Sequence, residues 1–244
     1  MDSLLDGAIR INDIEVRAHG GLSTPENLED GVIYIHKDAD FIERENAVLD
    51  RAHTRRMVEI GLLHGGDAIY WTERHQLERL CAIDIEKTPS LADYIKRNSL
   101  EDRIRLHSGV SQDDHAALSA IIAEDFDGEP IDAVIDDASH FYGETRATFE
   151  SVFPFLRPGG AYIIEDWAWG HTHDWPEELM AELPLMSPLL SELMLIVAHM
   201  TDVIRSIEVD RNFAVVWRGD HSLPTDGSFR LADHMRTRGF TIAL

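Results

Sequence analysis

The sequence predicts an α/β fold: a doubly wound, mostly parallel sheet of seven strands that closes with an antiparallel hairpin. Two observations carry this prediction. From Met57 onward, short apolar runs typical of buried strands alternate with segments of helical periodicity. Towards the C-terminus, two further strand-like runs are separated only by Arg211 and Asn212, as in an antiparallel hairpin.

Five strand patterns precede this hairpin, and a turn or a helix follows each one. The five strands are expected at 57–61, 81–85, 104–109, 131–138 and 161–166. The expected helices run from the glycine turn at Gly65 to about Leu80, then over 90–98, 112–124, 144–155 and about 179–200. The tetrad Arg157-Pro158-Gly159-Gly160 predicts a turn before the fifth strand. The hairpin strands are expected at 204–210 and 213–219.

Residues 1–56 are less periodic than the rest of the chain. We expect them to form an N-terminal cap, with a helix over 41–56 that leads into the first strand of the sheet. No internal repeat, low-complexity tract or long Gly/Ser linker marks a further domain. The predicted organisation is therefore a cap over 1–56 and one α/β domain over 57–244.

Composition and charge restrict the class of protein. Hydrophobic residues make up 44% and charged residues 27%, as in ordinary globular proteins. The net charge of −23 repels phosphate backbones, so we expect no nucleic-acid partner. No stretch approaches the roughly 18 apolar residues of a membrane span, and the N-terminus lacks a secretory signal. Cys81 is the only cysteine, which excludes an intrachain disulfide, and we expect a cytoplasmic protein without membrane contact.

A glycine turn follows the first predicted strand. Gly61 and Gly65 let the backbone approach a ligand, and the helix that begins there offers free N–H groups to a small anion. The G-x-x-x-G spacing differs from the G-x-G-x-x-G of dinucleotide-binding proteins, which disfavours NAD. Asp84 ends the second strand, where a carboxylate can accept hydrogen bonds from both hydroxyls of a ribose. The combination predicts a nucleoside-binding site.

Acidic pairs end two further strands. Asp136-Asp137 ends the fourth strand and Glu165-Asp166 ends the fifth. Neighbouring parallel strands lie about 4.8 Å apart and their carboxyl ends share one edge, so these carboxylates can meet one cation. Oxygen ligands favour a hard cation such as Mg²⁺. Because consecutive strand residues point to opposite faces, Glu165 and Asp166 can both bind it only where the strand breaks into a loop.

A histidine lies three residues beyond Asp137. His140 can accept a proton at neutral pH, so we expect it to act as a general base. The alternative is a histidine that only caps or bonds its own loop. His171 and His173, in the loop after the fifth strand, are expected to face the substrate or the solvent.

These motifs together resemble a family of metal-dependent class I methyltransferases of natural-product pathways. The resemblance rests on Glu-Ile-Gly-x-x-x-Gly-Gly at 59–66, Asp-Asp-x-Ser-His at 136–140 and Glu-Asp at 165–166, and covers about 57–219. The family includes the macrocin and mycinamicin type of macrolide-sugar O-methyltransferases, and the cephalosporin hydroxylase protein is a structural relative. The sequence departs from the pattern at Asp67, where serine is common, and at Val110, where many relatives have an acidic residue.

The resemblance implies a Rossmann-like class I fold and a role for each motif. The implied contacts with S-adenosylmethionine are made by Glu59, Gly61, Gly65, Asp84, Ser111, Gln112 and Asp136. The implied ligands of Mg²⁺, or of a similar hard cation, are Asp137, Glu165 and Asp166, and the catalytic residues are His140 with Asp137. The implied reaction is O-methylation of a sugar hydroxyl, such as one on rhamnose, in a glycosylated natural product. Relatives commonly form homo-oligomers, so we expect one here.

Three other functions stay open at this point. The first is a metal-dependent methyltransferase of a catechol or another phenol, which needs a base less because a phenol ionises readily. The second is a non-catalytic accessory protein that binds S-adenosylmethionine, and the third is a metal-dependent hydrolase without a nucleoside pocket. Trp167, Trp169, Trp175 and the segment 179–200 would form either a lid over the acceptor or ordinary core.

Overall fold

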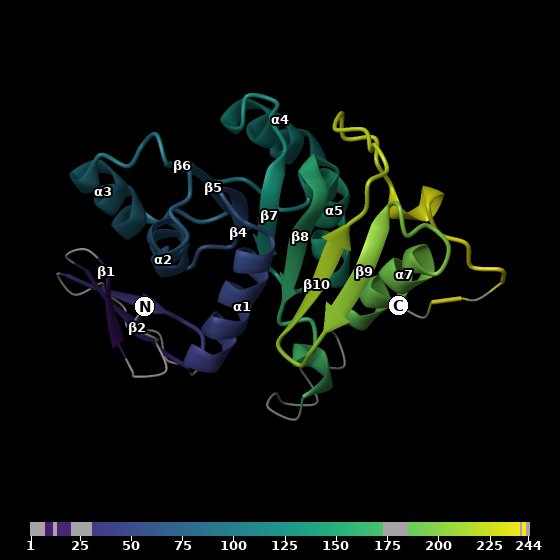
Figure 1. The fold of residues 1–244 in the computed structure, drawn as a ribbon, viewed down its shortest axis with the longest axis horizontal. Helices are drawn as coiled ribbons and strands as arrows, with labels where there is room; N and C mark the ends of the chain where they lie inside the picture. The colour runs from purple at the N-terminus through teal and green to yellow at the C-terminus, as the bar shows by residue number, and fades with distance from the viewer. Residues whose placement is uncertain (1–7, 12–13, 21–30, 173–184, 240, 243–244) are drawn as a thin grey trace.

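The computed structural model describes residues 8–11, 14–20, 31–172, 185–239 and 241–242. Its main sheet has seven strands in the order β6-β5-β4-β7-β8-β10-β9 (Figure 1). The strands are β4 (Arg56–Ile60), β5 (Arg79–Asp84), β6 (Ile104–Ser108), β7 (Ile131–Asp136), β8 (Leu156–Glu165), β9 (Ile204–Val209) and β10 (Phe213–Arg218). The first five are parallel, and β10 pairs antiparallel with both β8 and β9. The predicted fold class is confirmed.

The strand order reverses at β4, which lies between β5 and β7. Ligands of open α/β sheets bind at the carboxyl ends of the strands beside such a reversal. Asp84, Asp136 and Glu165 are the last residues of β5, β7 and β8. The topology therefore gathers these predicted site residues along one edge.

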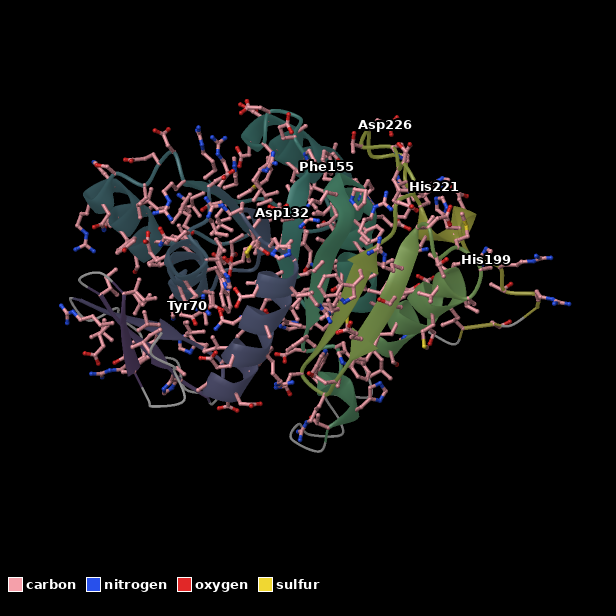
Figure 2. The ribbon with its side chains drawn as sticks, in the orientation of Figure 1. Tyr70, Asp132, Phe155, His199, His221 and Asp226 are labelled. Atoms are coloured by element: carbon pink, nitrogen blue, oxygen red, sulfur yellow. The ribbon has the colours of Figure 1, made fainter. Side chains whose placement is uncertain are left out.

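Helices cover both faces of the sheet. Apolar side chains of one face pack with α1 (Ala39–Arg51), α2 (Gly66–Arg74) and α3 (Pro89–Asn98). Those of the other face pack with α4 (His115–Asp125), α5 (Tyr142–Val152) and α7 (Ser187–Val197). Figure 2 labels Tyr70 in α2, and its hydroxyl accepts a 2.8 Å hydrogen bond from Asn46 in α1. Within the described ranges, no helix is long and apolar enough to cross a membrane.

The N-terminal segment contains a second sheet that the sequence did not predict. It consists of β1 (Ala8–Ile11), β2 (Ile14–Ala18) and β3 (Val32–Ile35), with β1–β2 antiparallel and β2–β3 parallel. The expected helix over 41–56 was too long, because α1 ends at Arg51. The chain turns there: Thr54 donates from its backbone N–H and its hydroxyl to the carbonyl of Leu49, and His53 has φ 50°. The division into a cap and a domain at residue 57 stays a prediction.

The boundaries of α2 and α4 also differ from the expected ones, in both cases for local reasons. α2 ends at Arg74 rather than near Leu80, because Gln76 adopts φ 51°. α4 begins at His115 because the side chain of Asp114 caps it, accepting from the N–H of Ala117.

The tetrad 157–160 lies inside β8 instead of in a turn before it. Gly159 has φ 77°, and the register between β7 and β8 shifts there, so the glycines form a bulge. Of the predicted helix over 179–200, residues 179–184 lie outside the described ranges.

Candidate active site

The loops after β4, β7 and β8 contact one another at the carboxyl edge of the sheet. The N–H of Asp137 donates to the carbonyl of Ile60 at 2.8 Å, which continues the β4–β7 ladder into the loop. The N–H of Asp166 donates to Asn212 in the β9–β10 turn at 2.7 Å. Both His140 and Asp166 have positive φ, 56° and 50°, so the chain turns sharply at these positions.

The glycine turn packs directly against the loop after β7. Gly61 has φ 86°, and a Cβ atom there would overlap the carbonyl group of Asp137. Gly65 has φ 79° and directly precedes α2. The carboxylate of Asp84 accepts from the N–H of Leu62 at 2.7 Å, which ties the end of β5 to this turn. The predicted nucleoside-site residues are therefore neighbours in space.

Glu59 lies deeper, inside β4, and its side chain is 1% exposed. Among the residues that the structure describes, none donates a hydrogen bond to its Oε2. Burial, and then the charge of Asp67, raise the pKa of Glu59 well above its ordinary value. An approaching cationic group would stabilise the ionised form of this carboxyl.

Two of the other predicted cofactor residues use their polar atoms inside the protein. Asp136 is buried and accepts from the hydroxyl of Tyr162 at 2.8 Å, while burial raises the pKa of Asp136 to about 7. Gln112 accepts from the N–H of Ser139 at 2.8 Å and donates to the hydroxyl of Thr148. The side chain of Gln112 thus supports the loop that carries His140, whereas Asp136 ties the end of β7 to β8.

The remaining predicted cofactor residue, Ser111, is hydrogen-bonded within its own loop. Ser111 donates to the carboxylate of Asp113 in the loop before α4. The structure does not bring Ser111 into the acidic cluster of Asp137 and Asp166.

Asp137, His140 and Asp166 form a cluster that can hold a metal ion. One donor atom from each lies within 4.8 Å of the other two. Nε2 of His140 lies 3.7 Å from Oδ1 of Asp137. The indole N–H of Trp169 donates to the backbone carbonyl of His140 at 2.9 Å and so fixes the histidine loop.

Glu165 belongs to a second group of charges on the other side of Asp137. It is 1% exposed, and its Oε1 lies 3.1 Å from the ammonium nitrogen of Lys37. Oδ2 of Asp137 lies 3.1 Å from the same nitrogen. Asp137 therefore joins the two groups, with Oδ1 towards His140 and Oδ2 towards Lys37.

The sequence reasoning missed Lys37 and Glu45, which the N-terminal segment contributes. Burial alone would lower the pKa of Lys37, but the carboxylates of Asp137, Asp67 and Glu165 outweigh it and raise the pKa well above its ordinary value. Glu45, in α1, is fully buried and contacts the carboxyl of Glu165, and burial raises the pKa of Glu45 to about 7. Only Asp67 gave a signal in the sequence, as a departure from the family pattern.

These residues fit a hard divalent cation. Oε1 of Glu165 is buried, and no described part of the chain donates a hydrogen bond to it, although the ammonium of Lys37 is close. Burial, and then the charge of Asp137, raise the pKa of both Glu165 and Asp166. Besides burial, the negative charge of Asp137 thus disfavours ionisation of both groups, and a bound cation would offset that cost. Oxygen donors with excess negative charge are the surroundings that Mg²⁺ and similar ions prefer.

The sheet order and the helices on both faces give the fold of class I methyltransferases. Residues 58–167 match the family model described as a methyltransferase domain. The chain is 32% identical over 148 residues to demethylmacrocin O-methyltransferase of Streptomyces fradiae, covering 58% of this chain and 32% of that protein. It is 44% identical over 75 residues to a rhamnosyl-tetracenomycin-C 3'-O-methyltransferase of Streptomyces olivaceus, covering 30% and 18%. The predicted resemblance to macrolide-sugar O-methyltransferases is confirmed.

A solved structure supports the same relationship. The MycE methyltransferase of the mycinamycin biosynthetic pathway, in complex with Mg, SAH and mycinamycin VI, superposes with a TM-score of 0.54 at 26% identity. The match covers 78% of this chain and 52% of MycE. The chain therefore spans about half of MycE and a third or less of the curated relatives named above.

Proposed function

We propose that this protein transfers a methyl group from S-adenosylmethionine to a sugar hydroxyl of a glycosylated natural product, with Mg²⁺ or a similar cation. A deoxysugar such as rhamnose is the expected acceptor. The observation that carries the proposal is the cluster of Asp137, His140 and Asp166 beside the glycine turn. The relatives support the acceptor class, because their names specify demethylmacrocin and a rhamnosyl-tetracenomycin C as substrates.

The cofactor would lie along the glycine turn and the end of β5. Gly61 and Gly65 adopt the left-handed backbone conformation that forms this turn, and Asp84 retains carboxylate lone pairs for ribose hydroxyls beyond its bonds to Leu62 and Glu86. Glu59 supplies a buried carboxyl below the turn for the amino group of the methionine part. Glu59 and Asp84 thus distinguish the two ends of the cofactor.

Asp137 and Asp166 would hold the cation, with Glu165 as the further ligand that the family resemblance implies. A bound divalent cation lowers the pKa of a coordinated hydroxyl. Nε2 of His140 accepts the proton of the acceptor hydroxyl, from a position beside Oδ1 of Asp137. The hydroxyl oxygen then bonds to the methyl carbon while the carbon–sulfur bond breaks, and S-adenosylhomocysteine leaves. Because an anion and a sulfonium become neutral products, the protein's main contribution is positioning.

The test uses methyl-labelled S-adenosylmethionine with a panel of glycosylated and phenolic acceptors in the presence of Mg²⁺. We expect transfer to the glycosides, loss of transfer in EDTA and recovery when Mg²⁺ is added back. His140→Ala should lower turnover about 100-fold or more without weakening S-adenosylhomocysteine binding. The matched control is His199→Ala, an exposed histidine after α7 that should behave as the wild type.

Each rival function predicts a different result. Preferential transfer to phenols, with His140→Ala still active, would favour a phenol methyltransferase. Binding of S-adenosylhomocysteine without transfer to any acceptor would favour an accessory protein. Absence of such binding would favour a hydrolase. The expected homo-oligomer is part of the proposal and is tested by light scattering of the full chain.

A further inference from the structure

Lys37 places a positive charge inside the acidic part of the candidate site. Its side chain is 5% exposed, and its ammonium is hydrogen-bonded to Asp67 and lies 3.1 Å from both Asp137 and Glu165. Glu45 adds to the negative charge that acts on this ammonium. A buried lysine in such surroundings restricts the carboxylates around it, because each can approach the ammonium in only a few orientations.

The protein holds Lys37 firmly in this position. Lys37 lies between β3 and α1, and its ammonium is 5.8 Å from the centre of the Phe41 ring. β3 packs against the start of α2 so closely that a Cβ atom on Gly66 would overlap the carbonyl of Tyr34. Asp67, in the first turn of α2, provides the hydrogen bond. The N-terminal segment is thereby fixed to the glycine turn at the point where Lys37 enters the site.

We propose that Lys37 is a positioning residue for the cation site: its ammonium orients the carboxylates of Asp137 and Glu165 so that they can bind a divalent cation. The inference rests on the proposed function, because it requires such a cation to bind. It also makes the segment from β3 to α1 part of the active site.

Two physical effects of removing Lys37 have opposite signs. Deleting a positive charge next to an anionic site favours a dication, so a purely electrostatic role predicts tighter metal binding. Loss of orientation predicts weaker binding, because Asp137, Glu165 and Glu45 would repel one another and turn apart. Removing a group that orients metal-ligating carboxylates typically costs about 10–100-fold in metal affinity. We expect orientation to dominate, because Lys37 contacts Asp137 and Glu165 directly in a buried site.

The experiment titrates Mn²⁺ into the full chain without cofactor and measures free Mn²⁺ by electron paramagnetic resonance. We expect Lys37→Met to bind Mn²⁺ at least tenfold more weakly than the wild type. Lys96→Met, an exposed lysine on α3, is the matched control and should bind as the wild type does. S-adenosylhomocysteine affinity, measured in parallel, should stay the same in all three proteins, whereas a general loss of structure would weaken it too.

Lys37→Gln provides a second variant in case the methionine variant does not fold. Its shorter amide cannot reach both carboxylates, so weaker Mn²⁺ binding is again expected. Unchanged or tighter binding in either folded variant overturns the positioning role. In a Glu165→Gln background, Lys37→Met should cause a smaller loss of Mn²⁺ affinity than in the wild type. An equal loss in both backgrounds also contradicts the positioning role of Lys37. A wild type that binds no Mn²⁺ overturns the proposed cation site itself and the inference with it.

Discussion

Gly61 is the position where a single methyl group would most directly disturb the candidate site. Its φ of 86° lies in the left-handed region, where an alanine costs about 1–2 kcal/mol. The added Cβ would also lie 2.5 Å from the carbonyl carbon of Asp137 and 2.8 Å from Cα of Ala138. Carbon atoms in contact prefer a separation of about 3.5–4.0 Å. The Asp137 backbone must therefore move by about 1 Å in Gly61→Ala.

A displacement of that size has consequences for stability and for chemistry. The clash adds to the strain, so we expect Gly61→Ala to lower the free energy of unfolding by about 2–4 kcal/mol. Asp137 carries one of the proposed cation ligands, and a shift of about 1 Å in a reacting group can cost about 100-fold in rate. Methyl transfer by Gly61→Ala should fall by that factor, and Mn²⁺ binding should weaken.

Gly128→Ala is the matched control for backbone strain. Gly128 has φ 75°, but within the described ranges no atom lies within 4 Å of a Cβ atom built there. Urea denaturation, Mn²⁺ binding and labelled-methyl transfer should be measured for both variants. The difference between them isolates the clash with the loop of Asp137. If Gly61→Ala equals Gly128→Ala in all three measurements, the argument from close backbone approach is refuted.

Three further variants test other parts of the structure. Burial lowers the pKa of His75 to about 4, although the charge of Asp50 acts to raise it. In the unfolded chain the pKa of a histidine is about 6.5. The unfolded state therefore binds more protons below pH 6.5, so up to about 3 kcal/mol of stability is lost as the pH falls towards 4. His75→Gln should flatten that slope in urea denaturation between pH 4 and 8, and an unchanged slope contradicts the assignment. Asp84→Asn should weaken S-adenosylhomocysteine binding at least tenfold in calorimetry while Mn²⁺ binding persists; equal nucleoside affinity would remove Asp84 from the site. Figure 2 labels Asp132, which is at the opposite end of β7 from the site and accepts from Arg157 at 2.6 Å. Asp132→Ala should cost about 3–5 kcal/mol in urea denaturation without changing nucleoside affinity, and a change of less than about 1 kcal/mol would contradict a structural role.

The number of main-sheet strands and their positions along the chain could be predicted because their apolar runs are short and regularly interrupted. Boundaries depended on single residues that periodicity does not reveal. Gln76 ends α2 through a left-handed conformation, and Gly159 turns an apparent loop into a bulge within β8. A glycine pair after a proline is compatible with either a turn or a bulge, and only pairing with β7 decides between them.

The N-terminal sheet and Lys37 could not be predicted in the same way. β2 and β3 pair in parallel across the segment 19–31, and the pairing of two such short strands leaves no distinctive pattern in the sequence. Lys37 precedes its partner Asp67 by 30 residues and Glu165 by many more. The sequence identified Asp67 as unusual, but the identity of its partner depended on how β3 packs against α2.

The alternation of strand residues explains why the predicted acidic trio divides around Asp137. A strand must break for Glu165 and Asp166 to bind one ion, and the chain does break at Asp166, where φ is 50°. Glu165 itself still pairs in register with Phe213 of β10, so its side chain keeps the strand orientation and lies with Lys37. Asp166 lies with His140 on the other side of Asp137. Asp137 therefore lies between Glu165 and Asp166. A cation bound by both of these residues would also contact Asp137, whose Oδ2 atom already lies 3.1 Å from the ammonium of Lys37.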